Sequence, residues 1–276
     1  MREYKSVMAA SKTDGSRALS STKLKKFLCD LALGVGKIHL KYFGKVAYID
    51  RKEGAGLVTE ADHKSEKYAL QKIFKNFPKS TIITEETGKH AGTGNLVWIL
   101  DPLDGTTNYA HGFPWFCVSI ALHENGKPRA GVIYQPLTKE LFYAEKGRGA
   151  TRNGKKITVS KTTELRDALL GTGFYYTTGK KLAEEVEIFR KVQDKALGVR
   201  RPGSAAMDLA YMSCGIYDGF WERGLSSWDV AAGMILIEEA GGKVTDYRGN
   251  PTVVDSGELV ATNGILHSPI LELIRG

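Results

Sequence analysis

One short segment constrains the fold of this chain more than any other. Residues 98–108 read WILDPLDGTTN, in which an apolar run beginning at Leu96 ends directly in Asp101 and Asp104. A short, β-branched-rich apolar run is typical of a buried strand. In sheets covered by helices, ligands usually bind where strands end. The segment therefore predicts a mixed α/β (α+β) fold with a site at the end of this strand.

A second strand candidate ends in the same way. Residues 81–83 (TII) lead within two positions to Glu85 and Glu86. Three further strand candidates follow, separated by turn residues, and they predict an antiparallel meander. They cover residues 116–122, 129–134 and 140–144.

Two helices are expected before these strands. Apolar residues recur at helical spacing over 24–42, after a cluster of possible N-cap residues. Thr59 and Asp62 have the spacing of a capping box, which begins a second helix that Pro78 stops. Residues 1–21 have neither helical nor strand periodicity, and they predict a disordered tail.

The second half of the chain has its own pattern of elements. Residues 22–150 form one α+β half and residues 151–276 a second α/β half, and the two are expected to make one catalytic unit. The second half contains a strand candidate at 168–171 and helix candidates at 182–193, 204–217 and 228–240, the last ending at a Gly-Gly pair.

Composition narrows the class of protein. The net charge of +8 favours anionic partners, although the basic residues are scattered rather than clustered. Cys29, Cys117 and Cys214 lie far apart and form no disulfide framework, which predicts a reducing cytoplasm. No apolar run reaches the length of a secretory or membrane-spanning segment, so no membrane association is expected.

The acidic residues suggest a metal site. Asp101 and Asp104 repel each other at close range unless a cation lies between them, and magnesium prefers oxygen ligands and substrate phosphate. Pro102 constrains the backbone so that the carbonyl of Leu103 could turn inward as a further ligand. Simpler interpretations stay open: an Asx turn at Asp101-Asp104, a solvated Glu85-Glu86 pair, and a helix N-terminal charge at Asp229.

The residues after the second aspartate predict a phosphate site. Gly105, Thr106 and Thr107 stand where a helix can begin. Free backbone N–H groups at a helix start bind anions, and a glycine permits close approach of the ligand. Metal ions and helix start would then hold one phosphate together.

Four segments together resemble the inositol monophosphatase family of lithium-sensitive, magnesium-dependent phosphatases. They are 57–62 (LVTEAD), 85–86 (EE), 98–108 (WILDPLDGTTN) and 228–232 (WDVAA), and the similarity spans about residues 22–274. The resemblance implies a layered α-β-α-β-α sandwich of the sugar-phosphatase type, assembled as a homodimer. It also implies magnesium-dependent hydrolysis of myo-inositol monophosphate to inositol and phosphate.

The resemblance implies two to three magnesium ions in each active site. The first would be bound by Glu85, Asp101 and the Leu103 carbonyl, and the second by Asp101, Asp104 and Asp229. A third, looser ion would depend on Glu85 and water molecules.

Catalytic and substrate-binding roles also follow from matching positions. Asp62 and Thr106 correspond to residues that orient the attacking water, with Glu85 beside them, and Gly105 and Thr106 correspond to residues that supply phosphate-binding amides. No protein nucleophile is implied, and the six histidines form no metal-ligand or Ser/His/Asp pattern. The hydroxyls of the polyol would meet Gly203, Ser204, Ala205, Glu222 and Asp104.

The chain departs from the family pattern at two places. Gly56 stands where many relatives have an aspartate, and Thr84 where a glycine is common. The first departure affects the loop with Arg51, Lys52 and Gly54, and thereby third-metal binding and lithium sensitivity.

The metal motifs leave the substrate open. Related phosphatases act on fructose 1,6-bisphosphate, 3′-phosphoadenosine 5′-phosphate or histidinol phosphate, although residues 203–222 are more similar to the inositol type. A different alternative is a transcription-complex binding factor, since some bacterial relatives associate with RNA polymerase. The chain has no RNA-binding motif with interleaved aromatic residues, so association with nucleic acid lacks support in the sequence.

Overall fold

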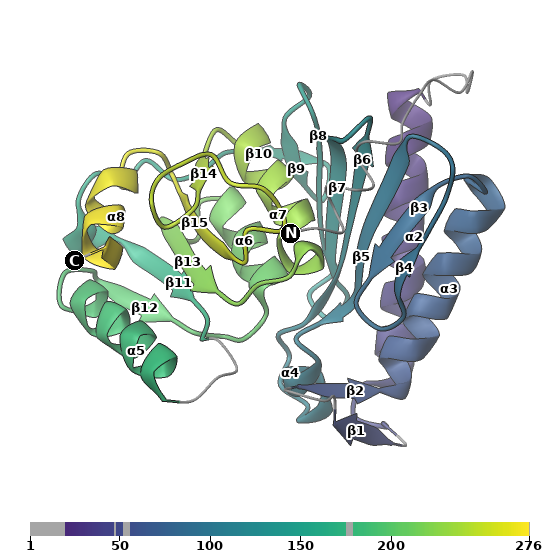
Figure 1. Ribbon diagram of the computed structural model, residues 1–276, viewed down its shortest axis with the longest axis horizontal. Helices are drawn as coiled ribbons and strands as arrows, with labels where there is room; N and C mark the ends of the chain where they lie inside the picture. Colours follow the sequence, from purple (N-terminus) through teal and green to yellow (C-terminus); the bar gives the residue numbers. More distant parts are fainter. Residues whose placement is uncertain (1–19, 47, 52–55, 175–178, 276) are drawn as a thin grey trace.

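Five layers alternate between helices and sheets in the computed structural model, which describes residues 20–46, 48–51, 56–174 and 179–275 (Figure 1). An eight-stranded and a five-stranded sheet are separated by one helical layer, and each has a further helical layer on its outer face. The helix pairs are, in order through the layers, α2 (Ser21–Tyr42) with α3 (Glu60–Asn76), α6 (Ala205–Ser213) with α7 (Ser227–Glu239), and α5 (Lys180–Gln193) with α8 (His267–Arg275). The predicted α-β-α-β-α sandwich is confirmed.

The eight-stranded sheet carries the acidic strand ends. Its order is β10-β9-β8-β7-β6-β5-β3-β4, and only β3 and β5 are parallel neighbours, with Thr84 beside Leu100. This register brings Glu85 and Asp101, the next residue of each strand, to the same end of the sheet. The strands are β3 (Thr81–Thr84), β4 (Gly88–His90), β5 (Leu96–Asp104), β6 (Cys117–Glu124), β7 (Lys127–Gln135), β8 (Glu140–Glu145), β9 (Ala150–Arg152) and β10 (Lys155–Ile157).

The apolar residues of β5 alternate between two cores. Trp98 and Leu100 pack in the core beneath α2 and α3, whereas Val97 and Ile99 pack in the core shared with α6 and α7. Burial on both faces explains why the strand reads as a continuous apolar run. The meander expected from β6 to β8 is confirmed by antiparallel pairing between consecutive strands.

Strand β5 is longer than the sequence indicated. The apolar run ends at residue 100, but the strand continues to Asp104, with an irregularity between the Asp101↔Ser119 and Asp104↔Cys117 pairs. Pro102 lies in this interval and has no N–H group to donate to β6, so regular pairing is interrupted there. The two aspartates therefore belong to the end of the strand rather than to a following loop.

The five-stranded sheet has the order β12-β11-β13-β15-β14, and it packs between the central helices and the outer pair α5 and α8. The helix expected over 204–217 ends earlier, at Ser213, because the amides of Ile216 and Tyr217 turn back to the carbonyl of Tyr211. The strands are β11 (Leu169–Thr172), β12 (Gly198–Arg200), β13 (Gly219–Arg223), β14 (Lys243–Thr245) and β15 (Glu258–Thr262).

Three short elements complete the fold: the hairpin β1 (Ile49–Arg51) and β2 (Leu57–Thr59), helix α4 (Thr106–Ala110), and one turn of 3-10 helix at Leu165–Asp167. Helix α2 already includes Ser21, so the expected tail is at least one residue too long, and its residues 1–19 lie outside the described part of the chain. Within the described residues, no helix has both the length and the apolar character needed to cross a bilayer.

Candidate active site

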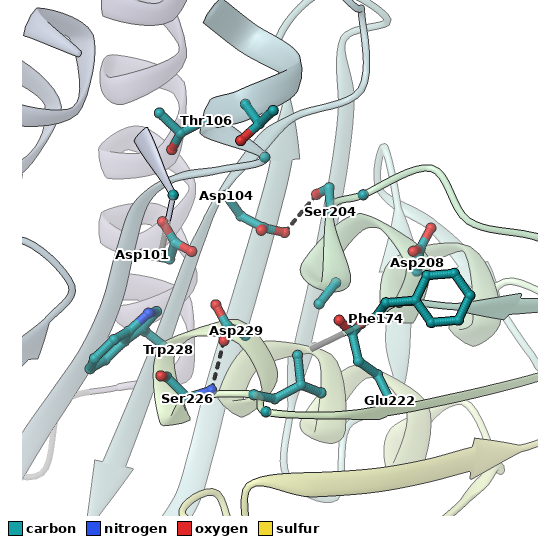
Figure 2. A pocket seen from close by; sticks show the side chains of 18 of the residues that line it. Asp101, Asp104, Thr106, Phe174, Ser204, Asp208, Glu222, Ser226, Trp228 and Asp229 are labelled. Carbon is teal, nitrogen blue, oxygen red and sulfur yellow. Dashed lines mark hydrogen bonds between the residues drawn. The ribbon is translucent and has the colours of Figure 1, made fainter. Parts of the chain in front are cut away.

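Three carboxylates meet at the end of β5. Asp101 and Asp104 come from that strand and Asp229 from the first turn of α7, and each offers a carboxylate oxygen within 4.8 Å of the others (Figure 2). Glu85, just after β3, lines the same cavity, which has a volume of about 250 Å³. The four acidic residues singled out from the sequence therefore border one cavity.

The simpler interpretations of these acids also hold locally. The Oδ1 atom of Asp101 accepts a hydrogen bond of 2.9 Å from the amide of Leu103, as in an Asx turn. Asp229 accepts a bond of 2.7 Å from the amide of Ser226 and completes a capping box at the start of α7. These bonds orient the carboxylates without removing them from the cluster, so local and functional roles coexist.

Negative charge is concentrated in this cluster. Burial raises the pKa of Asp101 well above its usual range, and the charges of Glu85, Asp104 and Asp229 raise it further. The pKa of Asp229 is likewise raised by burial and by Asp104. Burial raises the pKa of Asp104 to about 6, although hydrogen bonds from Ser204 and Ala206 act in the opposite direction. Oxygen donors that repel each other this strongly fit a hard divalent cation, whose charge would stabilise their ionised forms.

Leu103 borders the cavity as well. The Leu103 side chain is fully buried against Tyr109 and Phe116, whereas the residue as a whole lines the cavity wall. Its carbonyl oxygen lies 2.9 Å from the Oγ1 atom of Thr106. A carbonyl has two lone pairs, so a cation could still bind this oxygen.

Asp62 and Thr106 form a buried pair beside the cluster. The capping box predicted from the sequence is present: Asp62 Oδ2 accepts bonds from the amide of Thr59 (2.9 Å) and from its hydroxyl (2.6 Å). The other oxygen, Oδ1, lies 2.9 Å from Thr106 Oγ1. Burial raises the pKa of Asp62, and the bonds from Thr59 and Thr106 partly offset that effect.

A short helix starts at the cavity as expected. Gly105 precedes α4 with φ 87° and ψ 34°, and a Cβ atom there would lie 2.8 Å from the carbonyl oxygen of Trp115. Only glycine fits both the left-handed backbone and this close approach. Gly105, Thr106 and Thr107 all line the cavity next to the acidic cluster.

The opposite wall comes from α6 and its preceding loop. Ser204 donates a hydrogen bond of 2.6 Å from its hydroxyl to Asp104 Oδ2 (Figure 2). The amide of Ala206 donates one of 2.8 Å to the same atom. Gly203 and Ala205 line the cavity on either side of Ser204. The α6 start therefore orients Asp104 as well as forming part of the wall.

Glu222 reaches the cavity from β13. Burial and the negative charge of Asp104 raise the pKa of Glu222 to about 8, while the positive charge of Arg201 lowers it. Its carboxylate lies against Gly173, where even a Cβ atom would overlap it. Glu222 is thus closely enclosed at the side of the cavity away from α4.

Several cavity residues were missed in the sequence, among them Asp208, Arg201 and Phe174. Asp208 of α6 is 1% exposed, and its Oδ1 atom has no hydrogen-bond partner among the described residues. A signal for it existed, because Asp208 is the only charged residue in the otherwise apolar run AAMDLAYM. Arg201 lies over the ring of Phe174 at 5.7 Å, and no pattern pointed to either residue.

This chain is similar to known proteins over most of its length. The model of the inositol monophosphatase family matches residues 20–276. The inositol-1-monophosphatase of Synechocystis sp. is 42% identical over 247 residues, which cover 89% of this chain and 86% of that protein. The Nus factor SuhB of Pseudomonas aeruginosa is 40% identical over 235 residues, with 83% of this chain and 87% of that protein covered.

A solved structure shows the same fold. The crystal structure of the extragenic suppressor protein SuhB from Bartonella henselae has a TM-score of 0.88 and 36% identity to this chain. The match covers 91% of this chain and 98% of the Bartonella chain. The family match covers almost the whole chain, and it includes the acidic cluster, the α4 start and the α6 wall. The chain therefore belongs to the inositol monophosphatase family.

Proposed function

We propose that this protein is a magnesium-dependent phosphomonoesterase that hydrolyses myo-inositol monophosphates. The observation that carries the proposal is the approach of Asp101, Asp104 and Asp229 to within 4.8 Å of one another beside the start of α4. A cation-binding cluster next to the start of a helix suits a phosphate ester. Inositol-1-monophosphatase relatives about 40% identical to this chain support the choice of reaction.

The proposed magnesium ligands are the oxygen atoms at the strand ends. Glu85, Asp101 and the Leu103 carbonyl would bind a first ion, and Asp101, Asp104 and Asp229 a second. A third, weaker site would involve Glu85 and water. Bound magnesium ions supply Lewis-acid activation of water and neutralise charge on the phosphate and the leaving alkoxide.

The chain itself binds the phosphate and handles a proton. The amides of Gly105 and Thr106 hold the phosphate oxygens, so that water can attack in line with the leaving alcohol. The hydroxyl of Thr106 accepts a hydrogen bond from this water while it donates its own hydrogen to Asp62 Oδ1, 2.9 Å away. The proton lost by the attacking water can pass through Thr106 to Asp62 as the phosphorus–oxygen bond forms.

The polyol would occupy the wall opposite α4. Ser204 and Asp104 already share a hydrogen bond there, and Gly203, Ala205 and Glu222 line the adjoining surface. Each hydroxyl of a buried polyol needs a partner, and Glu222 can supply one. We propose that this group of residues selects an inositol phosphate.

Phosphate release from inositol 1-phosphate tests the proposal. Activity should disappear in EDTA, return with magnesium, and be lost in Asp101→Asn. A panel at equal concentration should rank inositol 1-phosphate above fructose 1,6-bisphosphate, 3′-phosphoadenosine 5′-phosphate and histidinol phosphate. Another substrate at the head of the panel would replace the inositol assignment, and no release from any polyol phosphate would refute the enzymatic proposal.

A second function is favoured by one group of relatives. The Nus factor SuhB of Pseudomonas aeruginosa is as similar to this chain as several inositol-1-monophosphatases are, and the net charge is +8. Association with a transcription complex is therefore the alternative proposal. Binding to RNA polymerase or RNA that weakens steeply with salt and persists in Asp101→Asn would support it. Absence of binding at low salt would exclude it.

The phosphatase proposal also includes homodimer formation and inhibition by lithium. A homodimer should have twice the chain mass in light scattering. Gly56 lines the cavity but has no carboxylate to offer a third ion. If millimolar lithium leaves turnover unchanged, we attribute this to the missing carboxylate. Gly56→Asp should then make turnover sensitive to lithium.

A further inference from the structure

Glu66 is a buried acid outside the cavity whose hydrogen bonds all go to one segment. It lies in the middle of α3 and is 2% exposed. No Lys, Arg or His of the described residues forms an ion pair with it. A buried carboxylate needs several donors in place of water, so the identity of these donors matters.

Among the residues that the structure describes, four donors surround the Glu66 carboxylate, and all come from residues 84–87. Oε2 accepts bonds from the hydroxyl of Thr84 (2.8 Å) and the amide of Glu86 (3.1 Å). Oε1 accepts bonds from the amide of Thr87 (3.1 Å) and from its hydroxyl. The turn after β3 thus wraps around the Glu66 carboxylate, as a backbone nest wraps around an anion.

The residue enclosed by these contacts is Glu85. Glu85 lines the active-site cavity. The Thr84 hydroxyl on one side of Glu85 and the amides of Glu86 and Thr87 on the other are all bonded to Glu66. The position of the Glu85 backbone is therefore set by a residue of α3. Charge-assisted bonds of this kind are stronger than bonds between neutral groups.

We propose that Glu66 is a positioning residue that holds Glu85 in the geometry needed to bind magnesium. The inference rests on the proposed function, in which Glu85 is a ligand of the first ion. Residues that orient metal ligands commonly change metal affinity about 10–100-fold when they are removed. Glu66 acts on magnesium through Glu85 and has no contact of its own with the substrate site.

The inference also accounts for Thr84, which stands where a glycine is common in the family. Thr84 is fully buried, and its hydroxyl supplies one of the four bonds to Glu66. A glycine would leave Oε2 with one protein donor fewer. In this chain the threonine therefore adds a contact that tightens the turn around Glu85.

Glu66→Gln tests the inference with little change in shape. The amide nitrogen of glutamine would face an N–H or hydroxyl donor, so at least one bond is lost and the charge is removed. Calorimetric titration with magnesium alone should show about tenfold weaker binding. The turnover rate at saturating magnesium should change much less than the magnesium concentration needed for half-maximal activity.

A matched control removes the same charge elsewhere. Glu272 is exposed on α8, far along the chain from β3, and Glu272→Gln should leave magnesium affinity unchanged. A double-variant cycle then separates positioning from general stability. In a Glu85→Gln background, Glu66→Gln should weaken magnesium binding by less than about twofold, because the residue through which it acts has been changed.

The outcomes separate this inference from the proposed function. If the wild-type protein binds no magnesium, both are overturned. If the wild type binds magnesium and folded Glu66→Gln binds it equally well, only the role of Glu66 is overturned. The same holds if the effects of Glu66→Gln and Glu85→Gln on magnesium affinity are additive. If Glu66→Gln does not fold, Thr84→Val decides: it should weaken binding while Thr84→Ser restores it, and equal binding by both overturns the inference.

Discussion

Thr106 Oγ1 lies 2.9 Å from Asp62 Oδ1, although 44 positions separate the two residues in the chain. Thr106 is the first residue of α4, and Asp62 is held by the capping box at the start of α3. Two helix starts therefore meet at one buried hydrogen bond beside the metal cluster. This contact joins the proposed proton acceptor to the hydroxyl that faces the attacking water.

Replacing Thr106 should separate catalysis from metal binding. Thr106→Val keeps the shape but removes the hydroxyl, so we expect turnover to fall about 10²–10⁴-fold, the usual contribution of a positioned acid–base group. Magnesium affinity by calorimetry should change little. Thr106→Ser, which keeps the hydroxyl, is the matched control and should retain most activity. Equal turnover of the Val and Ser variants would contradict the proton route.

A single methyl group at position 173 should disturb substrate recognition. Because the Cβ atom of Gly173→Ala would overlap the Glu222 carboxylate, that side chain has to move. We expect KM for inositol 1-phosphate to rise about tenfold, the equivalent of about 1.4 kcal/mol of binding free energy. Gly198→Ala, where the nearest atom is a flexible arginine nitrogen at 3.2 Å, is the control. Unchanged KM in Gly173→Ala would argue against Glu222 as a substrate contact.

Magnesium should stabilise the protein, and Asp229→Asn should reduce that effect. An ion at 100 times its Kd stabilises a folded protein by about 2.7 kcal/mol. The asparagine oxygen can still accept the capping bond from the Ser226 amide, while one charge leaves the cluster. We therefore expect the metal-free variant to melt at or above the metal-free wild type. It should gain less from magnesium than the wild type does, because the second ion loses a ligand while the ligands of the first ion are unchanged. If metal-free Asp229→Asn melts well below the metal-free wild type, repulsion between the carboxylates does not destabilise the metal-free cluster.

Two buried histidines should make stability depend on pH. Burial lowers the pKa of His123 to about 4, and it lowers that of His39 to about 4 despite the bond to the Pro102 carbonyl. An unfolded histidine takes up its proton near pH 6.5, so the unfolded state binds more protons as pH falls. The stabilisation by these groups is complete above pH 6.5 and is lost as pH falls toward 4.

Urea unfolding at pH 7.5 and 5.5 checks this prediction. With saturating magnesium to keep the acidic cluster ionised, each histidine should cost about 1 kcal/mol of unfolding free energy over this interval. His123→Gln should lose less unfolding free energy than the wild type between the two pH values, by the contribution of one histidine. The exposed residue His63 provides the control variant His63→Gln, which should keep the full pH dependence. If His123→Gln and the wild type lose the same unfolding free energy between pH 7.5 and 5.5, His123 is not a source of the pH dependence.

Much of the site could be predicted because its parts are local. The capping box at Thr59–Asp62 involves residues three positions apart, and the Asp101 turn involves residues two apart. Such bonds depend only on short stretches of chain, so sequence spacing is enough to indicate them. The strand that ends in acidic residues was predictable for the same reason. Its last four residues, 101–104, were not predicted as strand because they include Pro102 and lie beyond the apolar run.

Other features depend on which elements pack together. The amino-acid sequence by itself determined the acidic strand ends, the helix starts and the continuous apolar run of the central strand. Only the tertiary structure decided that β3 and β5 lie parallel, that α7 brings Asp229 to Asp101, and that Glu66 faces the turn at Glu85. Local bonds are set by neighbouring residues, whereas these approaches follow from burying both faces of each sheet against helices distant in the chain.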